Sequence, residues 1–309
     1  MFMNNMKRLG FFAYESLART VIHRRTNDIV KWRRPYCDSP EIRFPVILSW
    51  AIPFFWYNST DQTKIDKDEL AADDIKYDLT QKIIEADQLF LANKYEDVVH
   101  LLEEFKDNDD VQVLWRLSKA QYNMSLDENI SKEKRKYLIS SAHEFIIKAL
   151  TIDSNVSDIH KWAAILIDAH SNINYGIKEQ INKLDTIKLH LQKALELNPK
   201  DPYTRYMIGY WCYNLADISW FRREIGSIIF ATDIPSSTFE EALEYFREAE
   251  SIQPKFYCKN LLMLGKTFLK MDNKFSAEYY LKLVTQYPAK TVEDHQAKLE
   301  AEKILKSFG

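Results

Sequence analysis

A recurring spacing of large residues, small residues and prolines is the feature that most restricts how this chain can fold. The stretches LQKALELNP, ending at Pro199, and FREAESIQP, ending at Pro254, each place an Ala three positions after a large residue and a Pro five positions later. In the tetratricopeptide (TPR) pattern, small residues let two antiparallel helices approach closely, and a Pro ends the second helix. The spacing therefore predicts helical hairpins that stack along the chain.

Five such hairpins can be placed after about residue 76, with lengthened connections in the second, third and fourth, and a last helix over about 291–307 would cap the stack. The low glycine content, 6 residues in 309, agrees with a mostly helical chain. The predicted fold class is all-α: a TPR-like α-solenoid of about five helical hairpins with lengthened inter-helix connections and a C-terminal capping helix. The residues expected to face the hairpin interiors are Ala86, Val98, Leu102, Phe105, Trp115, Ala120, Ala142, Phe145, Ala149, Trp162, Leu166, Ile187, Leu191, Ala194, Gly209, Ala242, Phe246, Ala249, Gly265, Phe268, Ala277, Leu281 and Val284.

The fourth hairpin carries an insertion. Gly209 and Ala242 are 33 positions apart, where the TPR spacing leads us to expect about 12. The surplus is DISWFRREIGSIIFATDIPSS, and it predicts that the first helix continues to about Phe230 and that Pro235 ends the excursion. The second helix is then expected to start at SSTFEEAL, with Ser or Thr as N-cap and Glu behind it.

The insertion is rich in large apolar residues. Each would stabilise the fold by roughly 1.5–3 kcal/mol on burial, so we expect residues of about 217–235 to pack on an adjacent repeat. On this interpretation Trp220→Ala costs about 3–5 kcal/mol. Left exposed, the same residues would form a partner surface. They are Ile218, Trp220, Phe221, Ile225, Ile228, Ile229 and Phe230.

Two local basic features are candidate partner-binding sites. In SWFRRE, Arg222 and Arg223 adjoin two aromatic residues, and the alternative is that the arginines pair with acids such as Glu224. The stretch SKEKRK is the second feature, and its alternative interpretation is an ordinary solvated helix start. Its basic residues are Lys132, Lys134, Arg135 and Lys136.

The N-terminal region differs in charge from the rest of the chain, and we divide the sequence into a basic region 1–75 and a repeat domain 76–309. Residues 1–60 hold nine Lys/Arg and four Asp/Glu, or +5, whereas the remainder holds 33 basic and 41 acidic residues, or −8. A bulk attraction of the repeat domain to nucleic acid is therefore not expected. The basic, acid-poor run 7–43 is also compatible with a mitochondrial presequence.

An apolar stretch, FPVILSWAIPFFWY, occupies residues 44–57. Fourteen residues are too few to span a bilayer, and the two prolines oppose a regular helix. One interpretation is a segment docked on the helical domain. The other is an interfacial membrane anchor, in which aromatic residues lie at headgroup level beside the basic run. The anchor candidates are Trp50, Phe54, Phe55 and Trp56.

Motifs for catalysis, cofactors and metals are missing from the sequence. It contains no phosphate-binding Gly-rich loop, no HExxH and no paired Cys spacing, so we predict no enzyme activity, no cofactor and no metal site. Cys212 and Cys258 fall on apolar helix faces and are expected to be core thiols.

Several stretches together resemble the regulator of microtubule dynamics family. They are HKWAAILIDA, LQKALELNPKDP, WFRREIGSIIFAT and PSSTFEEALEYFREAE. The resemblance is close over about 156–309, looser over about 75–155, and it includes the irregular insertion. It implies a helical repeat protein that associates with microtubules and spindle poles and affects chromosome segregation. One branch of the family is anchored to the mitochondrial outer membrane and works at contacts with the endoplasmic reticulum.

The leading functional expectation is a non-enzymatic adaptor that binds microtubules or tubulin and other proteins through its repeat surface, in the cytoplasm at microtubules and the spindle. The alternative is a membrane-anchored mitochondrial contact-site protein whose repeats bind lipid or a partner peptide, with residues 44–57 as the anchor. A third class, a co-chaperone module that clamps acidic peptides, needs a regular groove, which the lengthened connections disfavour.

Overall fold

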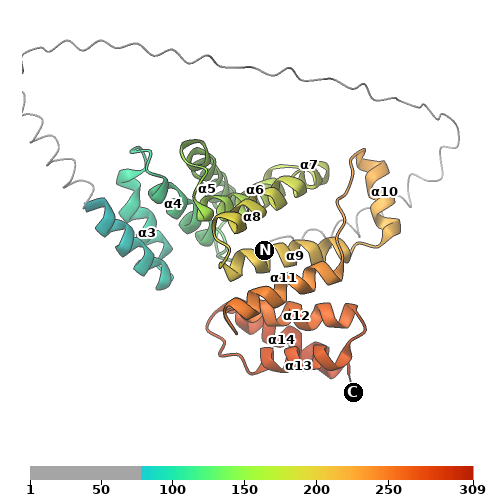
Figure 1. The fold of residues 1–309 in the computed structure, drawn as a ribbon. Helices are drawn as coiled ribbons and strands as arrows, with labels where there is room; N and C mark the ends of the chain where they lie inside the picture. The colour runs from blue at the N-terminus through green and yellow to red at the C-terminus, as the bar shows by residue number, and fades with distance from the viewer. Residues whose placement is uncertain (1–77, 309) are drawn as a thin grey trace, which may run out of the picture. The chain divides into compact units, whose positions relative to one another are not determined.

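The computed structural model describes residues 78–308, and every regular element in this range is a helix (Figure 1). The described residues from Lys82 onward belong to one compact unit. A helix over residues 78–91 comes first. The helices that follow are α3 (Tyr95–Leu102), α4 (Val111–Met124), α5 (Lys132–Ile152), α6 (Ser157–Asn174), α7 (Ile177–Asn182), α8 (Leu184–Leu197), α9 (Pro202–Ala216), α10 (Trp220–Phe230), α11 (Phe239–Ile252), α12 (Cys258–Lys270), α13 (Lys274–Thr285) and α14 (Val292–Lys306).

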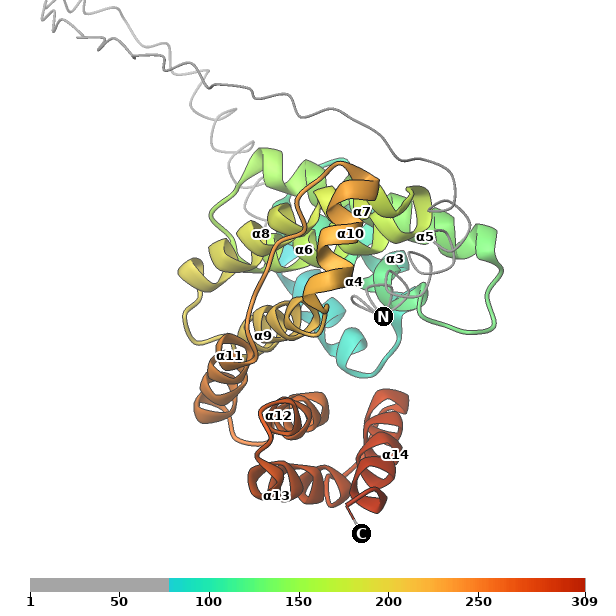
Figure 2. The same cartoon turned by 90° about the vertical axis from the view of Figure 1, so that its right-hand side faces the viewer.

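The helices pair as the small-residue pattern predicts. The helix over 78–91 precedes α3 in the chain, and α4 packs on α5, α6 on α8, α9 on α11 and α12 on α13. The capping helix α14 packs on α12 and α13 (Figure 2). All the residues predicted to face the hairpin interiors are buried except Phe105, Phe145 and Trp162, which are half-buried. The predicted TPR-like α-solenoid is thus confirmed.

Two glycines show why the pattern demands small residues. A Cβ added to Gly209 of α9 would lie 2.8 Å from the Phe246 ring of α11 and 3.2 Å from the Ala242 carbonyl oxygen. A Cβ on Gly265 of α12 would lie 2.8 Å from Leu281 of α13. The paired backbones therefore approach closely enough to exclude even a methyl group from the first helix.

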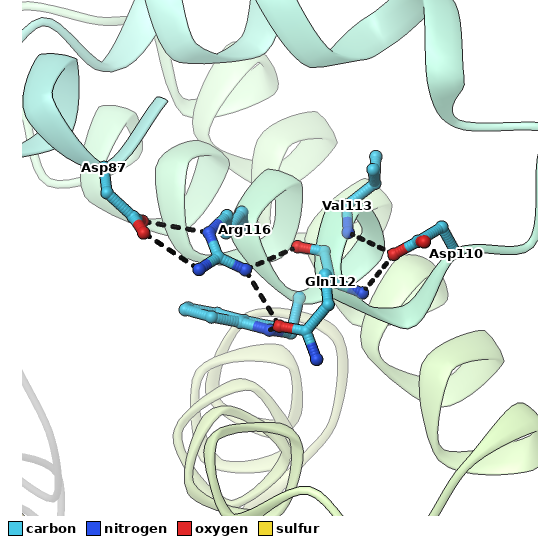
Figure 3. Close-up of polar contacts among 6 residues, drawn as sticks. Asp87, Asp110, Gln112, Val113 and Arg116 are labelled. Carbon is cyan, nitrogen blue, oxygen red and sulfur yellow. Dashed lines mark hydrogen bonds and ion pairs between the residues drawn. The ribbon is translucent and has the colours of Figure 1, made fainter. Parts of the chain in front are cut away.

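The helix starts are fixed by local side-chain caps. Asp110 accepts hydrogen bonds from the backbone N–H groups of Gln112 (2.7 Å) and Val113 (3.3 Å) at the start of α4 (Figure 3). At the start of α11, Thr238 and Glu241 form a reciprocal capping box, which confirms the predicted start of that helix. Such caps satisfy the N–H groups that have no partner within the helix.

The prediction for the insertion was wrong about its first helix. Instead of continuing to Phe230, α9 ends at Ala216, and a separate helix, α10, begins at Trp220. The break is stabilised by Arg223, whose Nη2 donates to the carbonyl oxygen of Leu215, 2.7 Å away. This hydrogen bond satisfies a carbonyl in the last turn of α9, so the helix can end there.

The predicted helix end near Phe230 is confirmed, since α10 ends at that residue, ahead of Pro235. Ala231 follows the last residue of α10 in the left-handed conformation (φ 48°, ψ 47°), which is a common way to end a helix. The chain then runs in extended form to α11. The predicted division of the chain at residue 75 and the predicted anchor segment 44–57 lie outside the described residues and stay predictions.

Candidate partner-binding surfaces

An aromatic surface runs along the first helices of the hairpins. On α9, the ring centroids of Tyr206 and Tyr210 are 6.0 Å apart, and Tyr206 meets Tyr257, at the start of α12, at 4.9 Å. On the preceding hairpins, Tyr122 of α4 meets Trp162 of α6 at 5.8 Å. All five residues are half-buried. We call these five residues the tyrosine face.

Carboxylates lie close to both groups of rings in the tyrosine face, the Tyr122–Trp162 pair and the Tyr206–Tyr210–Tyr257 group. Burial raises the pKa of Tyr122 and of Tyr210, and the carboxylate of Asp168, on α6, raises both further. Glu293 of α14 accepts a hydrogen bond from the Tyr257 hydroxyl (3.1 Å) and adds to the effect of burial in raising the Tyr257 pKa. The phenol groups therefore stay neutral at physiological pH, and one of the nearby carboxylates, Glu293, is itself paired with Lys259.

Several basic side chains on the first helices already have carboxylate partners. Arg116 of α4 forms two 2.9 Å hydrogen bonds with Asp87, in the helix over 78–91 (Figure 3). In the same way, Lys161 of α6 is 2.9 Å from Asp201. Lys259 and Lys266 of α12 are each 2.6 Å from a carboxylate of α14, namely Glu293 and Glu300. An acidic peptide would have to displace these internal carboxylates, which weighs against the carboxylate-clamp function.

Helix α10 forms a second surface, and it corrects the expectation that the insertion is core. Trp220 is 72% exposed and Ile228 is 78% exposed. Between them in the helix lies the exposed Glu224, so residues four apart present one outward face. The inward side of α10 offers little side-chain volume for packing. The buried Gly226 has no side chain there, and Ile234 approaches its backbone. Among the described helices, α10 packs extensively against none, and Figure 1 shows it standing beyond the ends of α9 and α11.

The insertion is nevertheless tied to the repeat domain. Ile218 and Phe230, at its two ends, pack against the hydrophobic core. The Thr232 hydroxyl donates to Oδ1 of Asn182, the last residue of α7, at 2.8 Å. The ends of the insertion are therefore anchored while its outward face is open to solvent.

The sequence over this repeat domain matches a known family. The family model described as regulator of microtubule dynamics protein 1-3 matches residues 83–309, which is well over half of the chain. The chain belongs to this family.

Individual relatives agree with the family match. Regulator of microtubule dynamics protein 1 of Bos taurus is 40% identical over 232 residues, which cover 75% of this chain and 73% of the relative. The human protein of the same name is 43% identical over 194 residues, covering 63% of this chain and 61% of the relative. Among solved structures, a thermophilic TPR protein of Thermus thermophilus matches with a TM-score of 0.50 at 12% identity, covering 72% of this chain and 97% of that chain. At that identity, the match supports the fold alone.

The two predicted arginines of this family member have different environments. Arg222 is exposed on α10, whereas Arg223 is half-buried and bound to the Leu215 carbonyl. The partner of Arg223 is thus a helix end rather than Glu224 or another acid. Of the two, Arg222 has the side chain free to meet a partner at the surface, and its role there stays a prediction.

The basic cluster at the start of α5 divides in the same way. Lys132, Lys134 and Lys136 are exposed. Arg135 is half-buried, and its guanidinium donates to the carbonyl oxygens of Ser125 (3.0 Å) and Asp127 (2.7 Å). Arg135 therefore fixes the connection between α4 and α5, while the three lysines remain candidates for partner contact.

The remaining predictions concern the membrane, metals and cysteines. The anchor candidates Trp50, Phe54, Phe55 and Trp56 lie outside the described residues. Within residues 78–308, no helix is both long and apolar enough to cross a membrane. In the same range, no group of three or more His, Cys, Asp or Glu side chains is arranged to hold a metal ion. Cys212 and Cys258 are buried thiols, as predicted.

The tyrosine face was not predicted from the sequence, although the spacing of two of its residues pointed to it. Tyr206 and Tyr210 are four residues apart on a predicted first helix, a spacing that places both on one side of it. Nothing local connects them with Tyr122, Trp162 or Tyr257, which come from other hairpins. Only the stacking of the repeats brings these rings together.

Proposed function

We propose that this family member is a non-enzymatic adaptor of the microtubule cytoskeleton that binds its partners through the surface of its helical repeats. The observation that carries the proposal is the outward face of α10, where Trp220 and Ile228 are exposed on an anchored insertion. A large aromatic residue beside an exposed arginine is typical of the residues that dominate protein interfaces. The names of the relatives, regulators of microtubule dynamics, support the microtubule as the partner.

Electrostatics support contact with an acidic surface such as that of the microtubule. Lys132, Lys134 and Lys136 occupy the first turns of α5, where the helix dipole disfavours positive charge. Helix stability therefore does not explain why lysines stand there. Together with Arg222, they would supply a salt-sensitive attraction even though the chain carries a net charge of −3.

Co-sedimentation with polymerised tubulin across a salt series tests this proposal. We expect the full chain to pellet with microtubules at low salt and to be released as salt is added. Changing the three α5 lysines to Glu should reduce pelleting at least tenfold. A matched control changes three exposed lysines of the third hairpin and the turn after it, and should leave pelleting within twofold. The control set is Lys178, Lys193 and Lys200.

Two outcomes would contradict the proposal. Absence of pelleting at low salt would exclude direct binding. Equal loss of pelleting in both triple variants would mean that only overall charge matters and that the α5 cluster is not a contact site.

For localisation we propose the cytoplasm, at microtubules and the spindle. A mitochondrial location is the second candidate, and the apolar segment 44–57 favours it. Imaging the tagged full-length protein beside a version that starts at Lys64 separates the two. If only the full-length protein is on mitochondria, the segment acts as an anchor; if both lie on spindles, it does not.

A further inference from the structure

Lys119 of α4 has an unusual environment for a lysine side chain. Its ammonium nitrogen, Nζ, lies 3.5 Å from the ring centroid of Phe90, in the helix over 78–91, and 5.8 Å from that of Trp115, one turn earlier in α4. Phe90 in turn packs on Tyr95 of α3, with ring centroids 5.0 Å apart. Lys119 is half-buried. The ammonium group is therefore placed among aromatic rings, while part of the residue is open to solvent.

Lys119 also differs from the neighbouring cations in having no acidic partner. Among the residues that the structure describes, its ammonium group takes part in no ion pair and no hydrogen bond. Arg116 of the same helix is paired with Asp87 at 2.9 Å. Lys161 of α6 is paired with Asp158 at 2.8 Å. The two carboxylates that attract Lys119 are thus engaged by other cations, and those cations repel it.

This environment favours the uncharged amine. Burial lowers the pKa of Lys119 from 10.5 to about 8, because the attraction by Asp87 and Asp158 offsets only part of its effect and the repulsion by Lys161 and Arg116 adds to it. The aromatic rings also attract the charged form, but a neutral ring stabilises it less than a paired carboxylate does. At pH 7.5 about a quarter of the Lys119 side chains are then neutral, against about one in a thousand for a lysine of ordinary pKa.

We propose that Lys119 is a modification site, at which the side-chain amine is acylated by small acyl thioesters without an enzyme. The lone pair of the neutral amine attacks the thioester carbonyl carbon, the C–S bond breaks, and an amide forms. The thiolate leaves and takes up the proton that the attacking nitrogen loses. The product is neutral, so the aromatic surroundings no longer hold a charge without a partner, and α4 loses one positive charge.

Acetyl coenzyme A and the full-length protein test the proposal. Acetylation rates are measured by mass spectrometry from about pH 6.5 to pH 9.5, with a reference peptide that contains one free lysine in the same tube. At pH 7.5 the neutral fraction of Lys119 exceeds that of an ordinary lysine about 200-fold. Its lower basicity reduces this advantage by about 10–20-fold if the slope found for thiolates applies. We therefore expect Lys119 to be acetylated about tenfold faster than the reference lysine.

The pH profile separates a shifted pKa from mere accessibility. The rate at Lys119 should level off above about pH 8, where its amine is already largely neutral. Burial lowers the pKa of Lys161, but Asp158 and Asp201 outweigh burial and raise it above its ordinary value. The rate at Lys161 should therefore still rise about tenfold per pH unit at the highest pH. A rate at Lys119 that does not exceed that of the reference peptide, or that rises steadily over the whole pH range, would overturn the proposal.

A pair of variants tests the role of the missing acid. Phe90→Glu places a carboxylate beside Nζ of Lys119, so it should lower the acetylation rate at pH 7.5 about tenfold and move the plateau to higher pH. The matched control is Leu91→Glu, at an 82% exposed position of the same helix, and it should alter the rate less than about threefold. Equal effects of the two variants would contradict the local cause. If Phe90→Glu fails to fold by circular dichroism, the pH profile of the parent protein still decides the proposal.

Discussion

Replacing Trp220 by Ala distinguishes a binding surface from a core position, and the chain offers a matched control. Trp220 is 72% exposed on α10, whereas Trp211 of α9 is 1% exposed. The Trp211 indole N–H also donates to the Leu184 carbonyl oxygen (3.3 Å), and Nζ of Lys188 lies 4.6 Å from its ring centroid. The two substitutions remove the same side chain from opposite environments.

The expected magnitudes follow from the buried area. A fully buried Trp removes about 250 Å² from water, and Trp220 buries roughly a quarter of that. At about 25 cal/mol per Å², this area is worth at most about 1.5 kcal/mol, and the better helix propensity of Ala offsets about 0.5 kcal/mol of the loss. Trp220→Ala should therefore cost about 1 kcal/mol, and Trp211→Ala about 3–5 kcal/mol.

Thermal unfolding followed by circular dichroism measures these differences. For a unit of this size, 1 kcal/mol lowers the melting temperature by about 2–4 °C. We expect a decrease of about 2–4 °C for Trp220→Ala and of about 10 °C or more for Trp211→Ala. Co-sedimentation of the Trp220→Ala protein with microtubules should fall at least fivefold at a temperature where it is folded.

Two outcomes would refute this reasoning. If Trp220→Ala lowers the melting temperature as much as Trp211→Ala does, then Trp220 is a core residue. If it leaves both stability and pelleting unchanged, α10 is not the microtubule contact.

Three other predictions concern stability. Gly209→Ala should cost about 1–2 kcal/mol in urea unfolding because its Cβ meets the Phe246 ring at 2.8 Å, whereas Gly226→Ala, which meets only the tip of one side chain, should be neutral or stabilising by up to about 1 kcal/mol. Thr238→Ala should cost about 1 kcal/mol in the same assay through loss of the capping box, and Thr238→Ser should restore most of it. Burial lowers the pKa of His143 to about 4 from its ordinary 6.5, so its contribution to stability is complete above pH 6.5 and is lost as the pH falls towards 4. A melting-temperature profile of His143→Gln should be flatter over this interval than that of the parent protein, and an unchanged slope would contradict the assignment.

The hairpins could be predicted from the amino-acid sequence, because the information that specifies them is local or repeats at a fixed spacing. Ala242 and Phe246 could be assigned to the interior of α11 from spacing alone, and both are fully buried. The start of that helix was predicted from the Thr and Glu of its capping box. Helix caps, prolines and small residues at close helix contacts each affect only a few positions. They can therefore be recognised in the sequence without knowledge of the fold.

Which surfaces these hairpins expose depends on how they pack in the folded chain. The apolar content of the insertion predicted that it is buried. Burial requires a partner helix, however, and no described helix packs along α10. Arg135 and Arg223 look like surface charges in the sequence, yet their guanidinium groups bind carbonyl oxygens at helix ends. The tyrosine face likewise exists only after α4, α6, α9 and α12 are stacked. These features depend on contacts between residues far apart in the chain, and no local pattern encodes such contacts.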